Sequence, residues 1–467
     1  MNDLSERWEV RGKRLLLTAH HFLCEVFAII YFFLFQGAKL LKKNRNNGFF
    51  FENISYFCIV KHLEKVIKLR FIALITLIIS EISVSYAQNG LSTVYESNDT
   101  VFSEIDPMDS VEVSLITCSP HEEIYSLYGH SALRWHDLHK TGPTAGQDLV
   151  FNWGLFNFNK PYFVLRFVFG LTDYELGAIK YEYFVPYYRK WGSSVTEQVI
   201  NLTNDEKRNL QKALAENLKP ENKVYRYNYF YDNCSTRPRD IIERSLNGKV
   251  EWADREDYKP TFREMVRECN RNHDWSRFGN DILLGLKADF KTDRIEQEFL
   301  PMNLMQDMAM AQVYANGEYR PLVKEQRDVV PPGVQMIEPD WILSPTEMAI
   351  IIVLVALSIM FAEWKQKKCF IWWDVMLMVA EGLIGLLLTV MIFSQHPTTS
   401  INLNILLFNP LPLFFIPSVV KGRNTWFKVL AVMIVLYALG GIWQSYPEGI
   451  WSLALCLLSR IVIRYAK

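Results

Sequence analysis

The sequence has no excess of charge of either sign and no closely paired cysteines. Its 50 Lys and Arg residues nearly balance 51 Asp and Glu residues, which leaves a formal net charge of −1. Nucleic-acid-binding domains usually carry a strongly basic surface, so we expect no nucleic-acid partner. The seven cysteines include no CxxC pair, which excludes the common zinc and thioredoxin-type patterns. We therefore expect neither a metal nor a cofactor.

Hydrophobic residues are plentiful but unevenly distributed. They make up 50% of the chain, yet the mean hydropathy is only +0.01, because a polar middle is followed by an almost wholly apolar last quarter. A chain of 467 residues is also too long for one simple soluble domain. We expect an exported α+β domain at residues 88–345 and an all-α membrane domain at residues 346–467.

A secretory signal peptide is predicted at residues 61–87. Four basic residues come first, the apolar run Phe71–Ile79 follows, and Ser85-Tyr86-Ala87 offers small residues before a cleavage point. This order of a basic, an apolar and a small-residue region is typical of export signals.

A signal peptide should stand at the N-terminus, whereas this one is preceded by sixty residues. We expect residues 1–60 to be an extension that arises from a misplaced start, with translation beginning near residues 63–66. The apolar stretch Leu15–Gln36 keeps a genuine N-terminal anchor open as the alternative.

The apolar last quarter predicts about five membrane-spanning segments. Pro410 and Pro412 interrupt the third of them. The expected spans are residues 346–362, 373–393, 401–420, 427–443 and 450–464.

The charges of the connecting loops predict how these spans are oriented. The loops 394–400 and 444–449 carry no Lys or Arg, and cytoplasmic loops are the ones enriched in these residues. Basic residues follow the first span (Lys365, Lys367 and Lys368), stand between the third and the fourth (Lys421, Arg423 and Lys428) and close the chain (Arg460, Arg464 and Lys467). We therefore expect an inner-membrane, multi-pass protein with residues 88–345 in the periplasm.

Cys234 is the candidate nucleophile of the exported domain. The alternating run Tyr225–Tyr231 predicts a strand, and Arg239–Leu246 predicts a helix, with Ser235 or Thr236 as its N-cap. A helix N-terminus stabilises an anion, so it favours the thiolate form of a nearby cysteine. A buried structural thiol remains possible, and so does a disulfide with Cys118 or Cys269.

His130 is the candidate base for this thiol. It follows Gly129 and opens an alternating strand, and a second strand at Leu149–Gly154 is expected to pair with it in antiparallel fashion. This pairing would bring Asn152 close enough to orient the imidazole, as the third member of a Cys–His site. His121, His136 and His139 lie in polar, loop-like surroundings, and we expect them to be solvated.

Several residues near these positions are candidates for binding substrate. Arg237 and Arg239 add positive charge beside Cys234, and Asn233 or the backbone N–H of Cys234 is a candidate oxyanion donor. The full set of binding candidates is Tyr128, Asn233, Arg237, Arg239 and His396. The aromatic stretch Phe156–Trp191 is either core or a lipid-facing lid.

Three motifs together resemble those of the Lnb-type lipoprotein N-acyltransferases. They are Leu115–Pro120, Tyr128–Arg134 and Asp232–Asp240, and Ser394–Thr399 with Asn409–Leu411 resemble the membrane part of that family. The order of His before Cys also resembles circularly permuted NlpC/P60-type thiol enzymes, which have a papain-like fold.

The resemblance implies an activity as well as a fold. Cys234 would be the catalytic thiol and His130 its partner. The substrate would be the amino-terminal cysteine of diacylated lipoproteins, and a phospholipid would donate the acyl chain within the bilayer.

Two other functions stay open at this stage. One is a membrane-tethered cysteine peptidase or amidase of the cell wall, although a single anchor would be enough to tether such an enzyme. The other is a non-catalytic lipoprotein-binding envelope protein in which Cys234 forms a disulfide.

Overall fold

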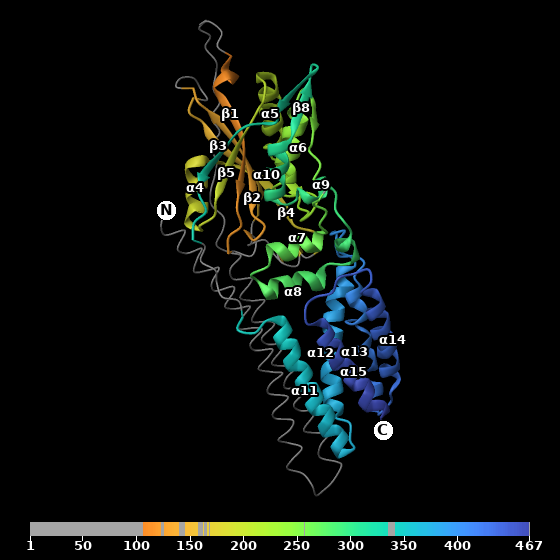
Figure 1. Cartoon of the computed structure of the whole chain (residues 1–467). Coiled ribbons are helices and arrows are strands. Elements are labelled where there is room, and N and C mark those ends of the chain that lie inside the picture. The colour runs from red at the N-terminus through yellow and green to blue at the C-terminus, as the bar shows by residue number, and fades with distance from the viewer. Residues whose placement is uncertain are drawn as a thin grey trace. The chain divides into compact units, whose positions relative to one another are not determined.

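The computed structural model describes residues 106–466, apart from 123–125, 140–144, 157–161, 163–165, 168, 256 and 335–340 (Figure 1). These residues form an α+β part, residues 106–334, and a helical part, residues 341–466. This change of structure agrees with the change of composition in the sequence. The predictions for residues 1–60 and 61–87 lie outside the described residues.

A seven-stranded antiparallel sheet is the centre of the α+β part. Its strand order is β10-β5-β1-β2-β3-β4-β6. The strands are β1 (Val111–Cys118), β2 (His130–Asp137), β3 (Asp148–Leu155), β4 (Asp173–Lys180), β5 (Val195–Ile200), β6 (Val224–Arg226) and β10 (Val323–Val330). The predicted hairpin is present, because β2 pairs with β3 in antiparallel fashion and Leu133 stands opposite Phe151.

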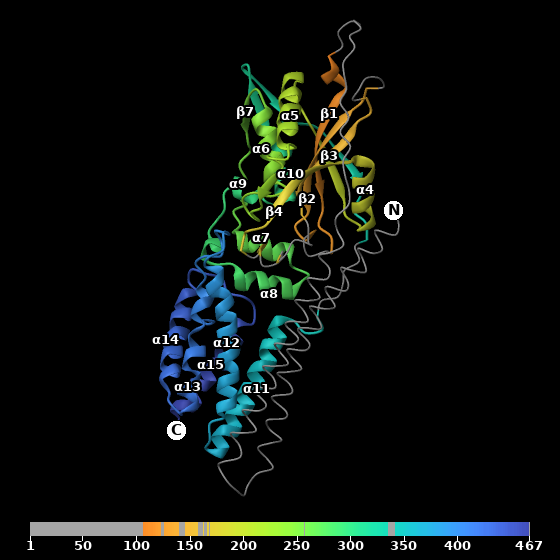
Figure 2. The same ribbon diagram turned by 180° about the vertical axis from the view of Figure 1, so that it is seen from behind.

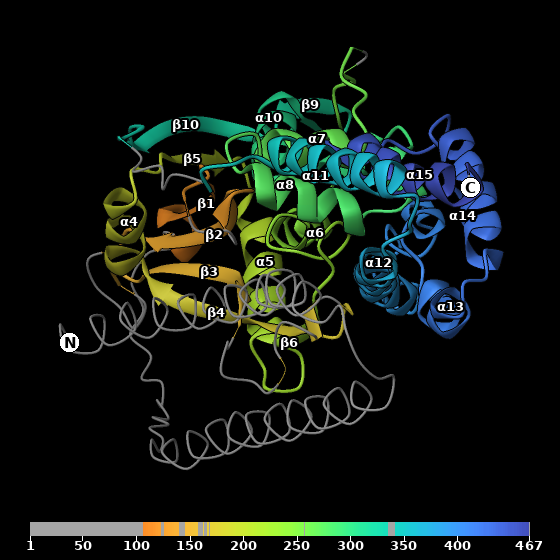
Figure 3. The same cartoon turned by 90° about the horizontal axis from the view of Figure 1, so that it is seen from below.

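Helices cover both faces of this sheet, as Figure 3 shows from below. One face packs on α5 (Asn204–Asn217), α6 (Thr236–Ser245) and α10 (Pro301–Met310), through a core that includes Leu133 and Trp153. The other face packs on α4 (Tyr181–Lys190), through Ala132 and Val150. Successive residues of a strand point to opposite faces, so β2 and β3 each contribute to both cores.

Smaller elements surround the main sheet. A second sheet of three antiparallel strands consists of β7 (Lys249–Glu251), β8 (Gln312–Ala315) and β9 (Glu318–Pro321). The helices α7 (Phe262–Cys269) and α8 (Asp274–Leu283) lie between the sheet and the helical part in both side views (Figures 1 and 2). The short helix α9 (Arg294–Gln297) precedes α10.

The predicted strand Tyr225–Tyr231 is too long. β6 ends at Arg226, and the chain then forms a tight turn in which Asn228 and Asp232 exchange backbone hydrogen bonds of 3.0 and 2.9 Å. Phe230 packs on Phe262 and Phe299 instead of following the alternation of a strand. Aromatic residues suit strands in general, but here their packing against α7 decides the backbone.

The aromatic stretch Phe156–Trp191 contributes to the core in part. It includes β4 and α4, and on α4 the side chains of Phe184 and Tyr188 are buried. Tyr183 and Tyr187 on the opposite side of α4 are exposed, at 62% and 42%. Residues 157–161 and 163–165 lie in the gaps of the described chain.

The helical part contains five α-helices and one 3-10 helix. They are α11 (Pro345–Gln366), α12 (Ile371–Met391), η5 (Leu403–Leu406), α13 (Leu411–Val420), α14 (Thr425–Gly440) and α15 (Ile450–Tyr465). The predicted interruption at Pro410 is present, since regular helix resumes only at Leu411.

Among the described residues, three segments are long and apolar enough to cross a membrane: α11, α12 and Leu403–Val420. The helices α14 and α15 have 16 residues each. A helix of that length rises about 24 Å, which is less than the hydrocarbon thickness of about 30 Å. The count of five spans therefore remains a prediction.

Two of the basic residues used to orient the spans are buried in ion pairs. Arg460 is 1% exposed, and it binds Asp374 at 2.7 Å and Glu363 at 2.9 Å. Arg464 binds the same Asp374. Carboxylates on α11 and α12 therefore balance both guanidinium groups, so Arg460 and Arg464 add no net charge to the end of the chain. The exposed lysines 365, 367 and 368 still support the predicted orientation.

The loop at residues 394–402 of the helical part forms hydrogen bonds with the α+β part. The backbone N–H of Gln395 donates to the carbonyl of Phe169 at 2.9 Å. The Nε2 atom of His396 lies 3.0 Å from the carbonyl oxygen of Phe167. Residues 285–286 donate two further backbone bonds to the same loop.

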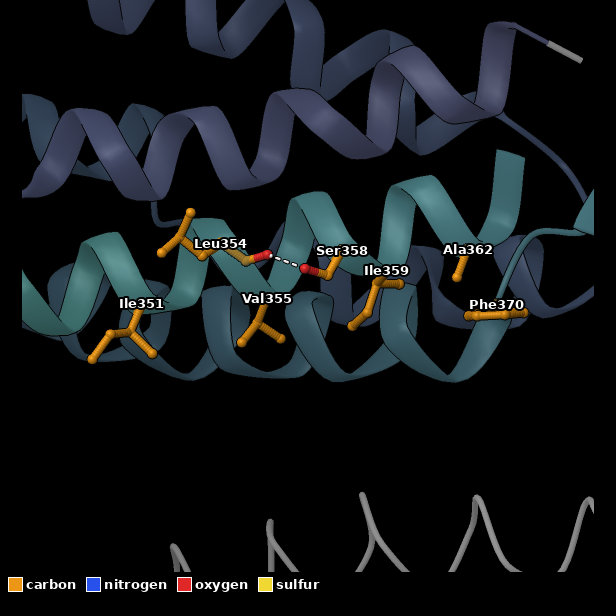
Figure 4. Close-up of a pocket in the computed structure, with 7 residues that line it drawn as sticks. All are labelled: Ile351, Leu354, Val355, Ser358, Ile359, Ala362 and Phe370. Atoms are coloured by element: carbon orange, nitrogen blue, oxygen red, sulfur yellow. Dashed lines mark hydrogen bonds between the residues drawn. The ribbon is translucent and has the colours of Figure 1, made fainter. Parts of the chain in front are cut away.

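An apolar groove of about 400 Å³ lies along α11 and the residue that precedes α12 (Figure 4). Its only polar lining residue, Ser358, donates its hydroxyl to the carbonyl of Leu354 at 2.8 Å. None of the predicted site residues lines this groove. The remaining lining residues are Ile351, Leu354, Val355, Ile359, Ala362 and Phe370.

Candidate active site

The β2–β3 hairpin places His130 beside Asn152. His130 is the first residue of β2, and Asn152 lies on β3 near the same end of the hairpin. The Nε2 atom of His130 is 2.7 Å from Oδ1 of Asn152. An amide oxygen can only accept a hydrogen bond, so Nε2 carries the proton. The neutral imidazole therefore has its lone pair on Nδ1, the nitrogen left to serve the thiol.

Cys234 lies two residues before α6, and the side chain of Asn233 shapes the turn that carries it. The Oδ1 atom of Asn233 accepts from the backbone N–H of Ser235 at 2.8 Å and of Thr236 at 3.1 Å. Asn233 therefore caps the helix, and the predicted cap Ser235 makes no side-chain capping bond. This arrangement holds Cys234 at the N-terminal end of α6, where thiolate is stabilised.

The structure brings Cys234 and His130 together. The imidazole of His130 and the thiol of Cys234 are close enough for each to shift the pKa of the other. A Cβ atom added to Gly154 would lie 3.7 Å from Cβ of Cys234 and 3.8 Å from Cε1 of His130. Gly154 thus lies beside both residues, and its φ of +120° is a backbone conformation that favours glycine.

Two serines also contact the thiol. The backbone N–H of Ser131 and the hydroxyl of Ser235 both help to lower the pKa of Cys234. Their hydroxyl oxygens lie 3.2 Å apart and both residues are fully buried. The sequence analysis named Ser235 only as a candidate N-cap and did not name Ser131, although each directly follows a predicted site residue. Gly154 was missed as well.

The electrostatics of the pair favour an ion pair of thiolate and imidazolium. Burial by itself would raise the pKa of Cys234, but the nearby His130 and the hydrogen bonds from Ser131 and Ser235 hold it below its usual value. Burial likewise opposes protonation of His130, but Cys234 and Asn152 raise its pKa above the usual value. Each group thus stabilises the charged form of the other.

The other cysteines of the α+β part have the opposite tendency. Burial raises the pKa of Cys118 well above its usual value and raises the pKa of Cys269 to about 12. Cys118, Cys234 and Cys269 are all free thiols, with no disulfide among the described residues. Of the three, Cys234 is the one whose surroundings favour the nucleophilic form.

Alkylation of the native, unreduced protein is expected to label Cys234 and to spare Cys118 and Cys269. Since the pKa of Cys234 is lowered, its labelling rate should rise with pH earlier than that of a free thiol. Peptide mass spectrometry over a series of pH values checks this. In His130→Ala, the rise should move to higher pH because the imidazolium is lost. A disulfide at Cys234 in active protein would contradict the prediction.

His121 is buried near the site, which differs from the prediction. We expected this residue to be solvated, but it is 2% exposed and stacks on Trp191 with ring centroids 5.0 Å apart. The pKa of His121 is lowered to about 4, mainly by burial and to a smaller extent by the nearby His130. Tyr188 of α4 stacks on His130 at 6.4 Å. The imidazole of His130 therefore has an aromatic wall on the α4 face.

The predicted oxyanion donor Asn233 has no donor left for a substrate. Its Nδ2 group donates to the carbonyls of Tyr229 at 3.0 Å and of Phe299 at 2.9 Å. An amide has two N–H groups, so both are used. Asn233 is a positioning residue of the Cys234 turn.

The other predicted binding residues are engaged in structural contacts. Arg237 binds Asp232 through two bonds of 2.6 and 2.7 Å, and Arg239 binds Asp240 and the buried Glu298. These carboxylates balance both guanidinium charges.

Tyr128 and His396 are also engaged with other parts of the chain. The hydroxyl of Tyr128 accepts from Asn270 at 2.6 Å. His396 binds the α+β part as described above, at Phe167. Contact of either residue with substrate stays a prediction.

Comparisons with known proteins assign both parts of the chain to one family. A family model described as the Lnb N-terminal periplasmic domain matches residues 99–268, and one described as the Lnb transmembrane domain matches residues 337–467. No curated protein and no solved structure matches the chain. The two models identify a membrane protein with a periplasmic segment, and their family suggests activity of the lipoprotein N-acyltransferase type. The chain belongs to the Lnb-type family, with an Lnb periplasmic domain followed by an Lnb transmembrane domain.

Proposed function

We propose that this protein is a lipoprotein N-acyltransferase. It transfers an acyl chain from a phospholipid, through a thioester on Cys234, to the amino group of the N-terminal cysteine of diacylated lipoproteins. The observation that carries the proposal is the Cys234–His130–Asn152 arrangement in a member of the Lnb-type family. We further propose that it is an inner-membrane protein with about five spans and that its periplasmic domain comprises residues 88–345.

The first half-reaction forms the thioester. The Cys234 thiolate attacks the ester carbonyl of the phospholipid, a carbon–sulfur bond forms, and the carbon–oxygen bond to the glycerol breaks. The departing oxygen takes the proton from Nδ1 of His130, so a lysophospholipid leaves. Asn152 keeps Nε2 protonated and thereby directs Nδ1 to the reacting atoms, as the third group does in other nucleophile–base sites.

The second half-reaction forms the amide. The neutral α-amino nitrogen of the lipoprotein attacks the thioester carbonyl and gives up a proton to Nδ1 of His130. The carbon–sulfur bond breaks, and Cys234 leaves as the thiolate. The thiolate–imidazolium pair is restored, so the cycle needs no added acid or base.

The position of the site supports a substrate that resides in the bilayer. β2 begins at His130 and β3 ends at Leu155. Because the two strands are antiparallel, these two residues lie at the same end of the sheet. The chain that follows β3 contacts the 394–402 loop of the transmembrane domain through Phe167 and Phe169. An acyl ester in the outer leaflet would thus approach the sheet from the side on which Cys234 lies.

The chain order of the site residues supports the proposed fold relationship. His130 opens a strand of the sheet and precedes Cys234, which lies just before a helix packed on that sheet. We propose that the domain is a circularly permuted NlpC/P60-type, papain-like fold. Papain-like enzymes use a Cys, a His and an Asn in the same three roles.

The proposal is tested by incubating the purified enzyme with phospholipid in the absence of lipoprotein. The Cys234 peptide is expected to gain the mass of one acyl chain, which neutral hydroxylamine should remove, and lipoprotein added later should accept that chain. Mass spectrometry of lipoprotein N-termini from cells with and without the protein provides the matching result. Cleavage of cell-wall peptides without acyl transfer would instead support the peptidase or amidase function.

A further inference from the structure

We propose that Arg166 and Arg226 form a subsite for the phosphate group of the phospholipid donor. This inference rests on the proposed function and assigns the part of the donor that the enzyme recognises. The Nη2 atom of Arg166 lies 3.1 Å from one carboxylate oxygen of Asp173, and Nε of Arg226 lies 2.8 Å from the other. Two guanidinium groups thus share a single carboxylate, and the cluster has one unbalanced positive charge.

Both guanidinium groups keep free donors. Arg166 uses Nε and Nη2 on Asp173 and on the carbonyl of Leu171, and Arg226 uses only Nε. The remaining N–H groups donate to no residue in the described part of the chain. A guanidinium has five N–H groups in a planar fork that fits phosphate oxygens. Side-chain exposures of 40% and 46% leave them accessible.

The cluster lies on the same face of the sheet as Asn152. Asn152 stands opposite Gly177 in the β3–β4 pair, and Asp173 stands opposite Arg226 in the β4–β6 pair. Residues two apart on β4 point to one face, so these side chains share it. Closer to the thiol, Gly154 lies beside Cys234, and the next residue, Leu155, stands opposite Glu175, two residues from Asp173 on β4. One or two strands across the sheet and two residues along it amount to roughly 8–12 Å from Leu155 to Asp173 and Arg226. A phosphate lies only a few bonds from the acyl ester of a phospholipid, so it can reach this cluster.

The cluster also lies beside the transmembrane domain. Arg166 directly precedes Phe167, whose carbonyl contacts His396 of the 394–402 loop. That loop follows α12, on the side predicted to face the periplasm, and lipid phosphates lie at the surface of the bilayer. Arg237 and Arg239 are less suitable, because carboxylates balance their charges. The Arg166–Asp173–Arg226 cluster therefore combines excess charge, free donors and the right location.

The test compares Arg166→Gln, Arg226→Gln and the double variant with a matched control, Arg208→Gln. Arg208 has the same side-chain exposure as Arg166, 40%, and pairs with Asp106, whose exposure of 27% matches the 26% of Asp173. Thioester formation on Cys234 is measured against the concentration of two donors with identical acyl chains in the same detergent. One donor is phosphatidylglycerol, and the other is diacylglycerol, which lacks the phosphate.

For phosphatidylglycerol, the double variant is expected to raise KM by about tenfold or more at unchanged kcat, since charge-assisted hydrogen bonds are lost. For diacylglycerol its KM should not change, and Arg208→Gln should leave both donors unaffected. Arg166→Lys with Arg226→Lys should recover part of the loss, because the charge remains. Inorganic phosphate should inhibit only weakly, since the subsite takes a phosphate that is linked to the lipid.

Equal losses with both donors would overturn the subsite, as would an unchanged KM for phosphatidylglycerol in the double variant. If inorganic phosphate inhibits at concentrations as low as the KM for phosphatidylglycerol, the cluster is instead a site for free phosphate. Absence of any thioester on wild-type Cys234 with either donor would refute the proposed function itself. The two failures are therefore distinguishable.

Discussion

Cys234→Ala is expected to abolish acyl transfer and the thioester, with a fall in kcat by a factor of about 10⁴ or more. The reason is that no other thiol of the α+β part has a lowered pKa. The fold should survive, because alanine fits in the space of the thiol. The measurement is transfer to a diacylated lipoprotein, together with the intact mass of the Cys234 peptide after incubation with phospholipid.

The control for this substitution is Cys269→Ala. Cys269 also lies in the α+β part, but burial raises its pKa to about 12, so activity should be retained. If Cys234→Ala still transfers acyl chains and rapid quenching of the wild type never traps acylated Cys234, the covalent mechanism is wrong.

His130 should act as a unit with Cys234. His130→Ala should remove most of the activity, while His136→Ala and His139→Ala should have little effect. The double variant Cys234→Ala with His130→Ala should be no worse than either single variant, because members of one catalytic unit are not additive. Losses that multiply in the double variant would give His130 a different role.

The largest expected effect on stability comes from Arg460→Ala in the transmembrane domain. Arg460 is buried and binds Glu363 and Asp374, which lie on two other helices. Its loss leaves Glu363 without an ion-pair partner in a buried setting, which typically costs about 3–5 kcal/mol. The melting temperature of the detergent-purified protein should therefore fall clearly. The exposed Arg423 supplies the control, since Arg423→Ala should change stability very little.

A compensating variant separates loss of charge balance from loss of packing. Arg460→Met with Glu363→Gln removes one charge of each sign and leaves the Asp374–Arg464 pair in place. This variant should recover a substantial part of the lost stability, because replacing a buried ion pair by neutral residues of similar volume is often tolerated. A double variant as unstable as Arg460→Ala would mean that packing, rather than charge, holds these helices together.

The sequence alone determined the features that depend on residues close together in the chain. The helix after Cys234 and the hairpin that brings Asn152 to His130 both follow from local patterns. Strand pairing across one loop needs no distant partner, so the Asn152–His130 contact could be inferred. The resemblance to the Lnb-type family also came from short motifs and was confirmed by the family models.

The tertiary structure decided which polar groups remain available. Asn233, Arg237 and Arg239 look like substrate contacts in the sequence, yet caps and carboxylates from other segments occupy them. Arg460 likewise resembles a loop charge until α11 and α12 supply its partners. Propensity likewise extended the strand after Tyr225 too far, because packing of Phe230 on α7 overrides it.

The Arg166–Asp173–Arg226 cluster is a case in which the sequence did not reveal polar groups that remain available. Arg166, Asp173 and Arg226 are unremarkable in the sequence, and they lie up to sixty residues apart. The pairing of β4 with β6 brings Arg226 to Asp173, the carboxylate that Arg166 also binds. A hydrogen bond or ion pair depends on positions in space to within a few tenths of an ångström. Sequence patterns determine the residue types that make such contacts possible, and the packed sheet determines which of them are made.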